Sequence, residues 1–221
     1  MKMDSQASTW HIQSRGVNPA ANGTPLPAFP SDTLSIAFLE ILDRRAREGG
    51  LKVLAYSMLA TQVDVVVRAE NDASVSSAFD AVFALYAQYT HTEQNQDYVV
   101  WMGRYDARMV EDGLTSSLLA CVENSPVRHG LARRAAEYAW SSARAHLGLE
   151  GDPELVERGL FSDLLDLPWF RQRWDGLAWA KILDETQVAE AIAGVAVSTP
   201  ARVRPTQRAP RARQKAAGRL Q

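Results

Sequence analysis

The sequence lacks the features that define several common protein classes. Its 221 residues contain a single cysteine, Cys121, which excludes an intramolecular disulfide framework and a zinc site built from several cysteines. The longest apolar run, near residues 191–197, is far shorter than the roughly 20 residues that a membrane-spanning helix needs. The opening residues, MKMDSQ, lack the apolar stretch of a secretory signal. We therefore expect a reduced, cytoplasmic protein with no membrane segment.

Acidic residues are missing from the C-terminal end of the chain. Residues 201–221 hold no Asp or Glu but seven basic side chains: Arg202, Arg204, Arg208, Arg211, Arg213, Lys215 and Arg219. Residues 1–200 carry 17 basic against 26 acidic side chains, a net charge of −9, while the tail carries +7. A basic arm of this kind usually binds phosphate or an acidic surface. Its Pro-, Arg- and Ala-rich composition from residue 198 predicts no fixed structure.

Apolar periodicity predicts alternating strands and helices along the rest of the chain. The predicted strands cover residues 9–15, 51–59 and 62–68, with a strand-and-turn segment over 98–110. The predicted helices run from Ser31 or Asp32 to Gly49, over 72–92 and 111–124, and from a cap at Ser141 to Gly148, with more helix from Asp152. Neighbouring antiparallel strands mixed with long helices predict an α+β fold, in which helices cover a small sheet.

Four segments, read in order, resemble the REP-associated tyrosine transposases, a branch of the single-domain HUH (IS200-like) transposases. The matching segments are WHIQSRG at 10–16, AYSMLATQVDVV at 55–66, WMGRY at 101–105, and PVRHG at 126–130 followed by YAWSS at 138–142. Each fragment is short, but their order and spacing across residues 9–148 make the combination fairly specific.

The resemblance implies a ferredoxin-like antiparallel sheet that binds hairpin-bearing single-stranded DNA. It assigns residues 1–148 to the transposase-like domain, 149–197 to a helical extension and 198–221 to a disordered basic tail. In active members, the two histidines of an H-x-H motif hold a divalent metal that offsets charge on the scissile phosphate. A tyrosine a few residues before the PVRxG segment attacks that phosphate and becomes covalently attached to it.

The residues at the chemical positions of this family are substituted in the present chain. Gln62 and Asp64 stand where the resemblance places the two histidines, Cys121 stands at the tyrosine position, and Ser125 replaces an asparagine. We expect a degenerate member without a catalytic residue or cofactor. Cys121 is then a small core residue, and Gln62 and Asp64 are solvated at the mouth of a former active site. If the site were active after all, Asp64 would suit Mg²⁺ or Mn²⁺.

Three functional hypotheses follow. The first is a catalytically silent binder of single-stranded or hairpin DNA, in which phosphates or bases contact Arg15, Arg104, Tyr105, Arg128 and the tail arginines Arg202, Arg204, Arg208, Arg211 and Arg213. The structural alternative for Arg15, Arg104 and Arg128 is salt bridging around the sheet edge. The second hypothesis is an active metal-dependent nuclease with a rebuilt site. The third is a scaffold for a protein partner, or a transposase relic, which the net charge of −9 over residues 1–200 favours.

Three tryptophans and four histidines are further candidates for functional residues. Trp10, Trp101 and Trp140 either stack on unpaired bases or pack in the core, and packing is the more common role. The histidines His11, His91, His129 and His146 share no helical spacing in the sequence and predict no ligand cluster.

Overall fold

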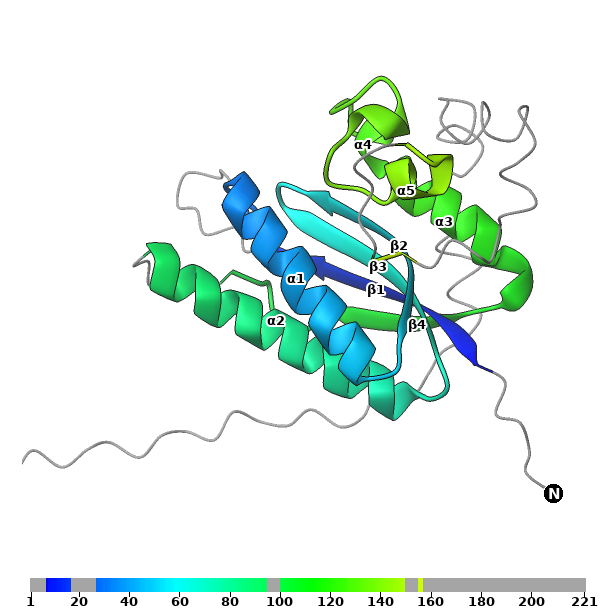
Figure 1. Cartoon of the computed structure of the whole chain (residues 1–221), viewed down its shortest axis with the longest axis horizontal. Helices are drawn as coiled ribbons and strands as arrows, with labels where there is room; N and C mark the ends of the chain where they lie inside the picture. The colour runs from blue at the N-terminus through cyan, green and yellow to red at the C-terminus, as the bar shows by residue number, and fades with distance from the viewer. Residues whose placement is uncertain (1–6, 17–26, 95–99, 150–154, 157–221) are drawn as a thin grey trace, which may run out of the picture.

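The computed structural model describes residues 7–16, 27–94, 100–149 and 155–156. Its centre is a four-stranded antiparallel sheet with the strand order β2-β3-β1-β4 (Figure 1). The strands are β1 (Ser8–Arg15), β2 (Lys52–Leu59), β3 (Gln62–Ala69) and β4 (Asp106–Val110). Together with the two long helices between them, this order is a ferredoxin-like α+β arrangement, and the predicted fold class is confirmed.

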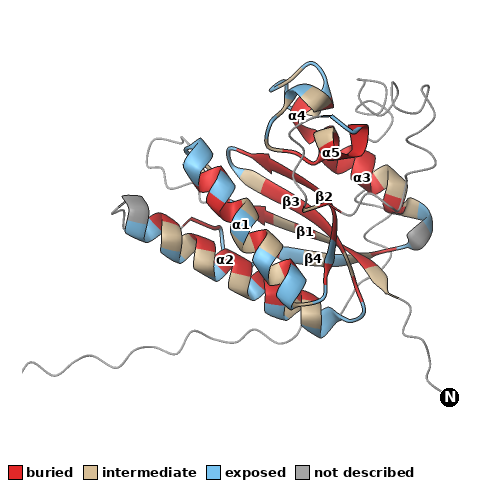
Figure 2. Ribbon diagram, in the orientation of Figure 1, coloured by how far each residue is buried: buried red, intermediate tan, exposed pale blue. Residues whose placement is uncertain are grey.

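Two long helices lie side by side on one face of the sheet (Figure 1). Helix α1 (Asp32–Glu48) joins β1 to β2, and helix α2 (Asp72–Gln94) joins β3 to β4. Ser31 caps α1, because its hydroxyl accepts a hydrogen bond from the Leu34 amide at 3.3 Å. The helices bury their apolar faces against the sheet, while their outer faces are exposed (Figure 2).

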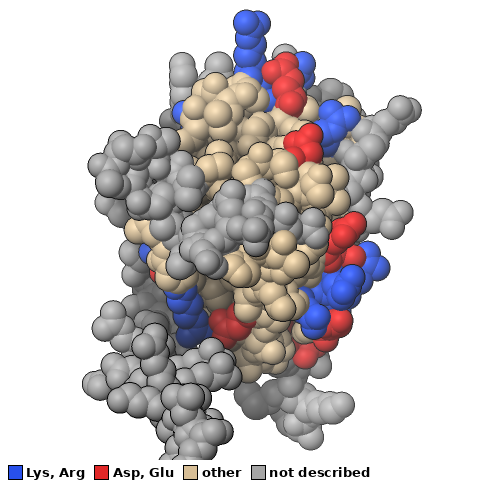
Figure 3. Space-filling model, turned by 90° about the vertical axis from the view of Figure 1, so that its left-hand side faces the viewer, with Lys and Arg blue, Asp and Glu red and all other residues tan. Residues whose placement is uncertain are grey.

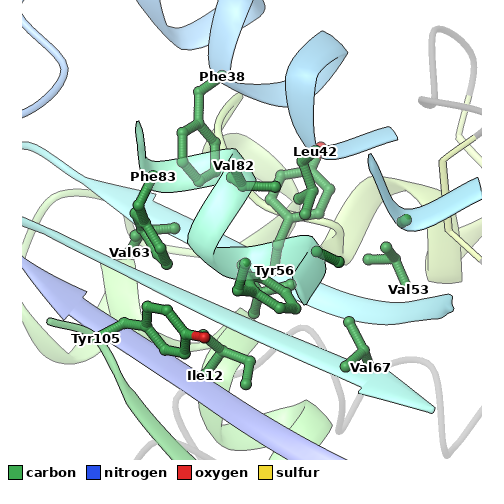
Figure 4. Packing of buried hydrophobic residues seen from close by; sticks show 14 of the residues in the cluster. Ile12, Phe38, Leu42, Val53, Tyr56, Val63, Val67, Val82, Phe83 and Tyr105 are labelled. Atoms are coloured by element: carbon green, nitrogen blue, oxygen red, sulfur yellow. The ribbon is translucent and has the colours of Figure 1, made fainter. Parts of the chain in front are cut away.

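Strand alternation divides the sheet residues between two cores. Val63, Val65 and Val67 of β3 point toward α1 and α2 and pack there with Ile12, Tyr56, Phe38 and Phe83 (Figure 4). On the opposite face, Val66 of β3 packs with residues of β2 and of helix α3 (Thr115–Glu123). The sheet is therefore covered on both sides, although the second core is smaller.

The segments after β4 differ in detail from the sequence prediction. The expected helix over 111–124 is a 3₁₀ turn at Asp112–Leu114 followed by α3, and a short helix α4 (Ser125–Arg128) succeeds it. Helix α5 (Ala143–Leu147) ends at Gly148, as predicted, because this glycine adopts the left-handed conformation with φ 65°.

Ser141 is not the cap of α5, so that prediction is wrong. The N-cap position is Ser142, whose side chain makes no capping hydrogen bond. The Ser142 hydroxyl is instead engaged with Glu123 of α3 and the Tyr56 amide of β2. The Ser142 hydroxyl therefore takes part in hydrogen bonds with α3 and β2, and it does not cap α5 as the local capping rule would predict.

The predicted helical extension and basic tail fall almost wholly outside the described residues. Of residues 149–221, the structure describes only Leu149 and residues 155–156. The predicted domain boundaries therefore remain predictions.

Candidate functional site

The alternation of β1 and β3 collects four polar side chains on the sheet face opposite α1 and α2. Trp10 and Ile12 point into the core of that helical layer, so the intervening His11 and Gln13 point the other way. Gln62 and Asp64 share this second face, because Val63 and Val65 occupy the first. The register places Gln13 directly opposite Asp64.

Asp64 is the centre of this polar group. His11 Nε2 and Gln13 Nε2 each lie 2.9 Å from Asp64 Oδ1, and Gln62 Nε2 donates to Asp64 Oδ2 at 3.1 Å. Asp64 is only 5% exposed. The expectation of a solvated carboxylate is therefore wrong, since hydrogen bonds from two strands hold this side chain inside the fold.

Ser57 of β2 faces the same side of the sheet and is paired in register with Asp64. It is fully buried, and its hydroxyl has no hydrogen-bond partner among the described residues. Buried hydroxyls without a partner are uncommon and call for an explanation. The carboxylate thus has a neighbour on β2 whose hydrogen-bonding capacity is unused within the described structure.

These residues do not reproduce the metal site that the resemblance implies. Gln62 and Asp64 supply one amide and one carboxylate in place of two imidazoles. Among the residues that the structure describes, no three His, Cys, Asp or Glu side chains gather closely enough to hold a metal ion. The H-x-H type of centre therefore does not fit this chain.

Cys121, which the sequence resemblance places at the position of the nucleophile, is held from the end of α4. It is 6% exposed, which agrees with its predicted place in the core. Arg128 Nη1 donates to the Cys121 carbonyl oxygen at 2.7 Å and lies 3.0 Å from Cys121 Sγ. Arg128, predicted to contact DNA, thus braces α3 against α4.

Ser125, the second substituted position beside α3, is also buried. His129 Nδ1 lies 2.8 Å from the Ser125 carbonyl oxygen and 3.4 Å from its hydroxyl. These contacts fall within a single helical turn, so Ser125 and His129 act locally in the α4 region.

A second buried polar group joins α3, α5 and β2. Glu123 is 0% exposed, and its Oε1 lies 2.5 Å from both Ser142 Oγ and His146 Nδ1. Ser142 also accepts a hydrogen bond from the Tyr56 amide at 2.9 Å. The group is closed to solvent and ties the YAWSS segment to the sheet.

The four segments that carry the resemblance meet around the end of the sheet where β2 turns into β3. The Gly16 amide donates to Thr61 O at 2.7 Å, and Gly16 forms a bridge with Trp101. On the β2 side, the Met58 amide donates to Trp140 O at 2.8 Å. Segments far apart in the sequence therefore build one neighbourhood around Gln62 and Asp64.

Arg15 and Arg104 both lie at this end of the sheet, but their surroundings differ. Arg15 is exposed at the last position of β1. Arg104 is also exposed, but its Nη2 lies 3.2 Å from Asp80 Oδ1 of α2. This contact is a salt bridge of the kind predicted as the alternative to a contact with DNA. The tail arginines predicted to bind DNA lie outside the described residues.

Tyr105 is placed for packing. Its ring is buried and stacks on Phe83 with 5.2 Å between centroids, and its hydroxyl donates to Ser76 O at 3.2 Å. Burial raises the pKa of this phenol. This placement argues against the predicted contact with DNA, because the ring is already committed to the core.

The tryptophans divide in a similar way. Trp10 and Trp101 are each 6% exposed, so they pack in the core and do not present a stacking surface. Trp140 is half-buried and packs against the same core.

Sequence reasoning missed His11 and Gln13 as members of the Asp64 group. The signal was present in the alternation of β1, which puts both residues on the face that Asp64 occupies. What the sequence did not supply was the register, since a shift of one residue would have turned both side chains away. His129 and His146 lie with Ser125 and Glu123 and form no cluster with His11.

Figure 3 shows one side of the molecule with mixed charge. Uncharged residues fill the middle of the described surface there, and Lys or Arg side chains at the margins have Asp or Glu beside them. This face, as far as it is described, carries no continuous basic surface.

Within the described residues, no helix is long and apolar enough to cross a membrane.

Comparison with known proteins identifies the fold. No protein-family profile matches the chain, and no curated protein is significantly similar in sequence. Among solved structures, the chain is similar to a REP-associated tyrosine transposase bound to a REP hairpin, with a TM-score of 0.50 and 16% identity. The match covers 68% of this chain and 92% of that one. The chain has a transposase-like fold.

A second similar structure is a Deinococcus radiodurans protein assigned as a transposase. It has a TM-score of 0.41 and 13% identity, and the match covers 56% of this chain and 95% of the other.

Proposed function

We propose that this protein binds single-stranded DNA containing a hairpin and does not cleave it. The observation that carries the proposal is the likeness of fold to a transposase that was solved with a REP hairpin. Residues 1–148 form the binding domain in this proposal. Arg15 supplies an exposed cation at the end of the sheet where the resembling segments converge, and the basic tail adds a phosphate grip that does not depend on sequence.

The absence of cleavage follows from the residues at the chemical positions. A phosphoryl transfer of this type needs a nucleophile that can reach the phosphate and an electrophile that neutralises developing charge. Cys121 is buried and lies against Arg128, and the Asp64 carboxylate already accepts three hydrogen bonds. Neither group resembles the exposed phenol or the imidazole pair of an active member.

Binding is tested with a labelled hairpin oligonucleotide and an unstructured oligonucleotide of the same length and composition. We expect the hairpin to be retarded at a lower protein concentration than its control, with a strong dependence on salt. Arg15→Ala should weaken binding, since it removes an exposed cation from the proposed surface. Lys52→Ala, at the first residue of β2, is the matched loss of one exposed cation outside the convergence region. Equal affinity for the two oligonucleotides would refute hairpin recognition.

A rebuilt nuclease is the second candidate, and the contact between His11 and Asp64 favours it. An imidazole beside a carboxylate is a common pair of ligands for a hydrolytic metal. This candidate predicts a shortened strand in the presence of Mn²⁺ or Mg²⁺, which Asp64→Asn abolishes. If no product forms in either metal, the candidate fails while the binding proposal stands.

A further inference from the structure

Positive charge is concentrated in one stretch of residues 1–149. Residues 1–123 carry nine basic and 15 acidic side chains, a net charge of −6. Residues 124–149 reverse this balance to +3, because four arginines stand against a single acid, Glu137. The four arginines are Arg128, Arg133, Arg134 and Arg144. A local excess of arginine on an otherwise acidic protein marks a surface for an anionic partner.

Two of these arginines hold the fold together, and the other two face solvent. Arg128 joins α3 to α4 through its contacts with Cys121. Arg144 Nη1 donates to the Ala136 carbonyl oxygen at 3.2 Å. Arg133 and Arg134 are exposed. The outward-facing charge of this stretch therefore comes from two neighbouring residues.

Both exposed arginines belong to the loop of residues 129–134, the basic loop, which joins α4 to the 3₁₀ turn η2 (Ala135–Glu137). Hydrogen bonds give this loop a defined shape. The Leu131 amide donates to the Pro126 carbonyl oxygen at 2.8 Å, and the Arg133 amide donates to Glu137 Oε2 at 3.3 Å. Cations on a loop fixed in this way lose less conformational entropy on binding than cations on a flexible arm.

The basic loop lies at the same end of the sheet as Arg15. The chain that follows it returns to β2 just before the turn into β3. There the Tyr138 hydroxyl donates to the Met58 carbonyl oxygen and the Met58 amide donates to the Trp140 carbonyl oxygen, both at 2.8 Å. Helix α4 lies at the top of the molecule in Figure 1, and Lys or Arg side chains project at the top of Figure 3.

Paired DNA is the anion that suits two neighbouring cations best. A duplex carries one negative charge per about 1.7 Å of its axis, whereas one strand carries one per about 3.4 Å. We infer that the basic loop binds the phosphates of the hairpin stem through Arg133 and Arg134. This inference rests on the proposed function, and it adds the surface by which the protein distinguishes a stem from an unpaired strand.

The test is an anisotropy titration of the full-length protein with a labelled hairpin that has no unpaired flanks, repeated at several salt concentrations. The double variant Arg133→Ala/Arg134→Ala should bind this hairpin at least about tenfold more weakly, because two charge-assisted hydrogen bonds are lost. The slope of log affinity against log salt should become less negative by about 1.8, from roughly 0.9 per duplex phosphate. The loss of affinity for an unstructured strand should be smaller.

The matched control is Arg44→Ala/Arg47→Ala, which removes two exposed cations from α1 and should change the affinity by less than about twofold. Arg133→Ala alone, with an expected loss of about threefold, decides the test if the double variant melts at a lower temperature than the parent. Parent-like hairpin affinity of the loop variants, or equal losses in the loop and α1 variants, would overturn the inference and leave the proposed function standing. Failure of the parent to bind the hairpin would overturn both.

Discussion

Glu123 shows how a single buried carboxylate holds the resembling segments together. Replacing it with Ala leaves the Ser142 hydroxyl and the His146 ring without their shared acceptor in a site closed to water. We expect Glu123→Ala to lower the free energy of unfolding by about 3 kcal/mol, measured by urea denaturation. Glu40→Ala, on the exposed face of α1, is the matched control and should change stability by less than about 0.5 kcal/mol. Equal effects of the two variants would contradict the role assigned to Glu123.

Tyr138 makes stability sensitive to alkaline pH. Its hydroxyl donates to Met58 O at 2.8 Å, and burial raises the pKa of this phenol. Above pH ~10, the unfolded chain loses a proton that the native state retains, so the free energy of unfolding falls as pH rises. Tyr138→Phe should therefore show a shallower fall between pH 9 and 11 than the parent.

The comparison of the two proteins at pH 7 isolates the cost of the lost hydrogen bond, because the Tyr138 phenol of the parent is protonated there in both the native and the unfolded state. Parallel alkaline slopes for parent and variant would show that Tyr138 is not responsible for the pH dependence.

At the scale of elements, the start of α1 depends on one side chain. Ser31 has an extended backbone and accepts a hydrogen bond from the Leu34 amide. Ser31→Ala should destabilise the protein by about 1 kcal/mol in urea unfolding. Ser77→Ala, an exposed position inside α2, should be neutral or slightly stabilising because alanine is the better helix former. A Ser31→Ala variant as stable as the parent would mean that the cap contributes nothing.

Local patterns were sufficient for the elements whose period is clear. The alternation in β1 and β3 and the cap at Ser31 predicted three elements to within one or two residues. The failures are tertiary in origin. The Ser142 hydroxyl donates to Glu123 and does not cap α5. Asp64 is buried because the neighbouring strand β1 contributes hydrogen-bond donors to it. Neither outcome can be derived from spacing along one segment.

The candidate site was predicted in part for the same reason. Gln62 and Asp64 were placed on one face by the period of a strand, and the structure agrees. His11 and Gln13 required the pairing of β1 with β3 in a particular register. That pairing depends on how the whole sheet packs. The likeness in fold therefore indicates it better than any single motif does.

At the scale of the whole molecule, charge is divided between an acidic body and a basic tail. Residues 1–200 carry −9 and residues 201–221 carry +7, and the described side in Figure 3 has mixed charge. If the tail grips phosphates, its removal should weaken hairpin binding. The slope of log affinity against log salt should become less negative by up to about 5, from roughly 0.7 per phosphate contact. Tighter binding after deletion of residues 201–221 would contradict this role.

The protein is proposed to bind hairpin DNA without cleaving it, and one measurement tests both parts of this proposal. The full-length protein is incubated with an end-labelled hairpin oligonucleotide in Mn²⁺ and in Mg²⁺, and equal samples are run on native and denaturing gels. We predict a retarded complex on the native gel and an intact, unmodified strand on the denaturing gel. A cut strand or a covalent protein–DNA adduct would contradict the account.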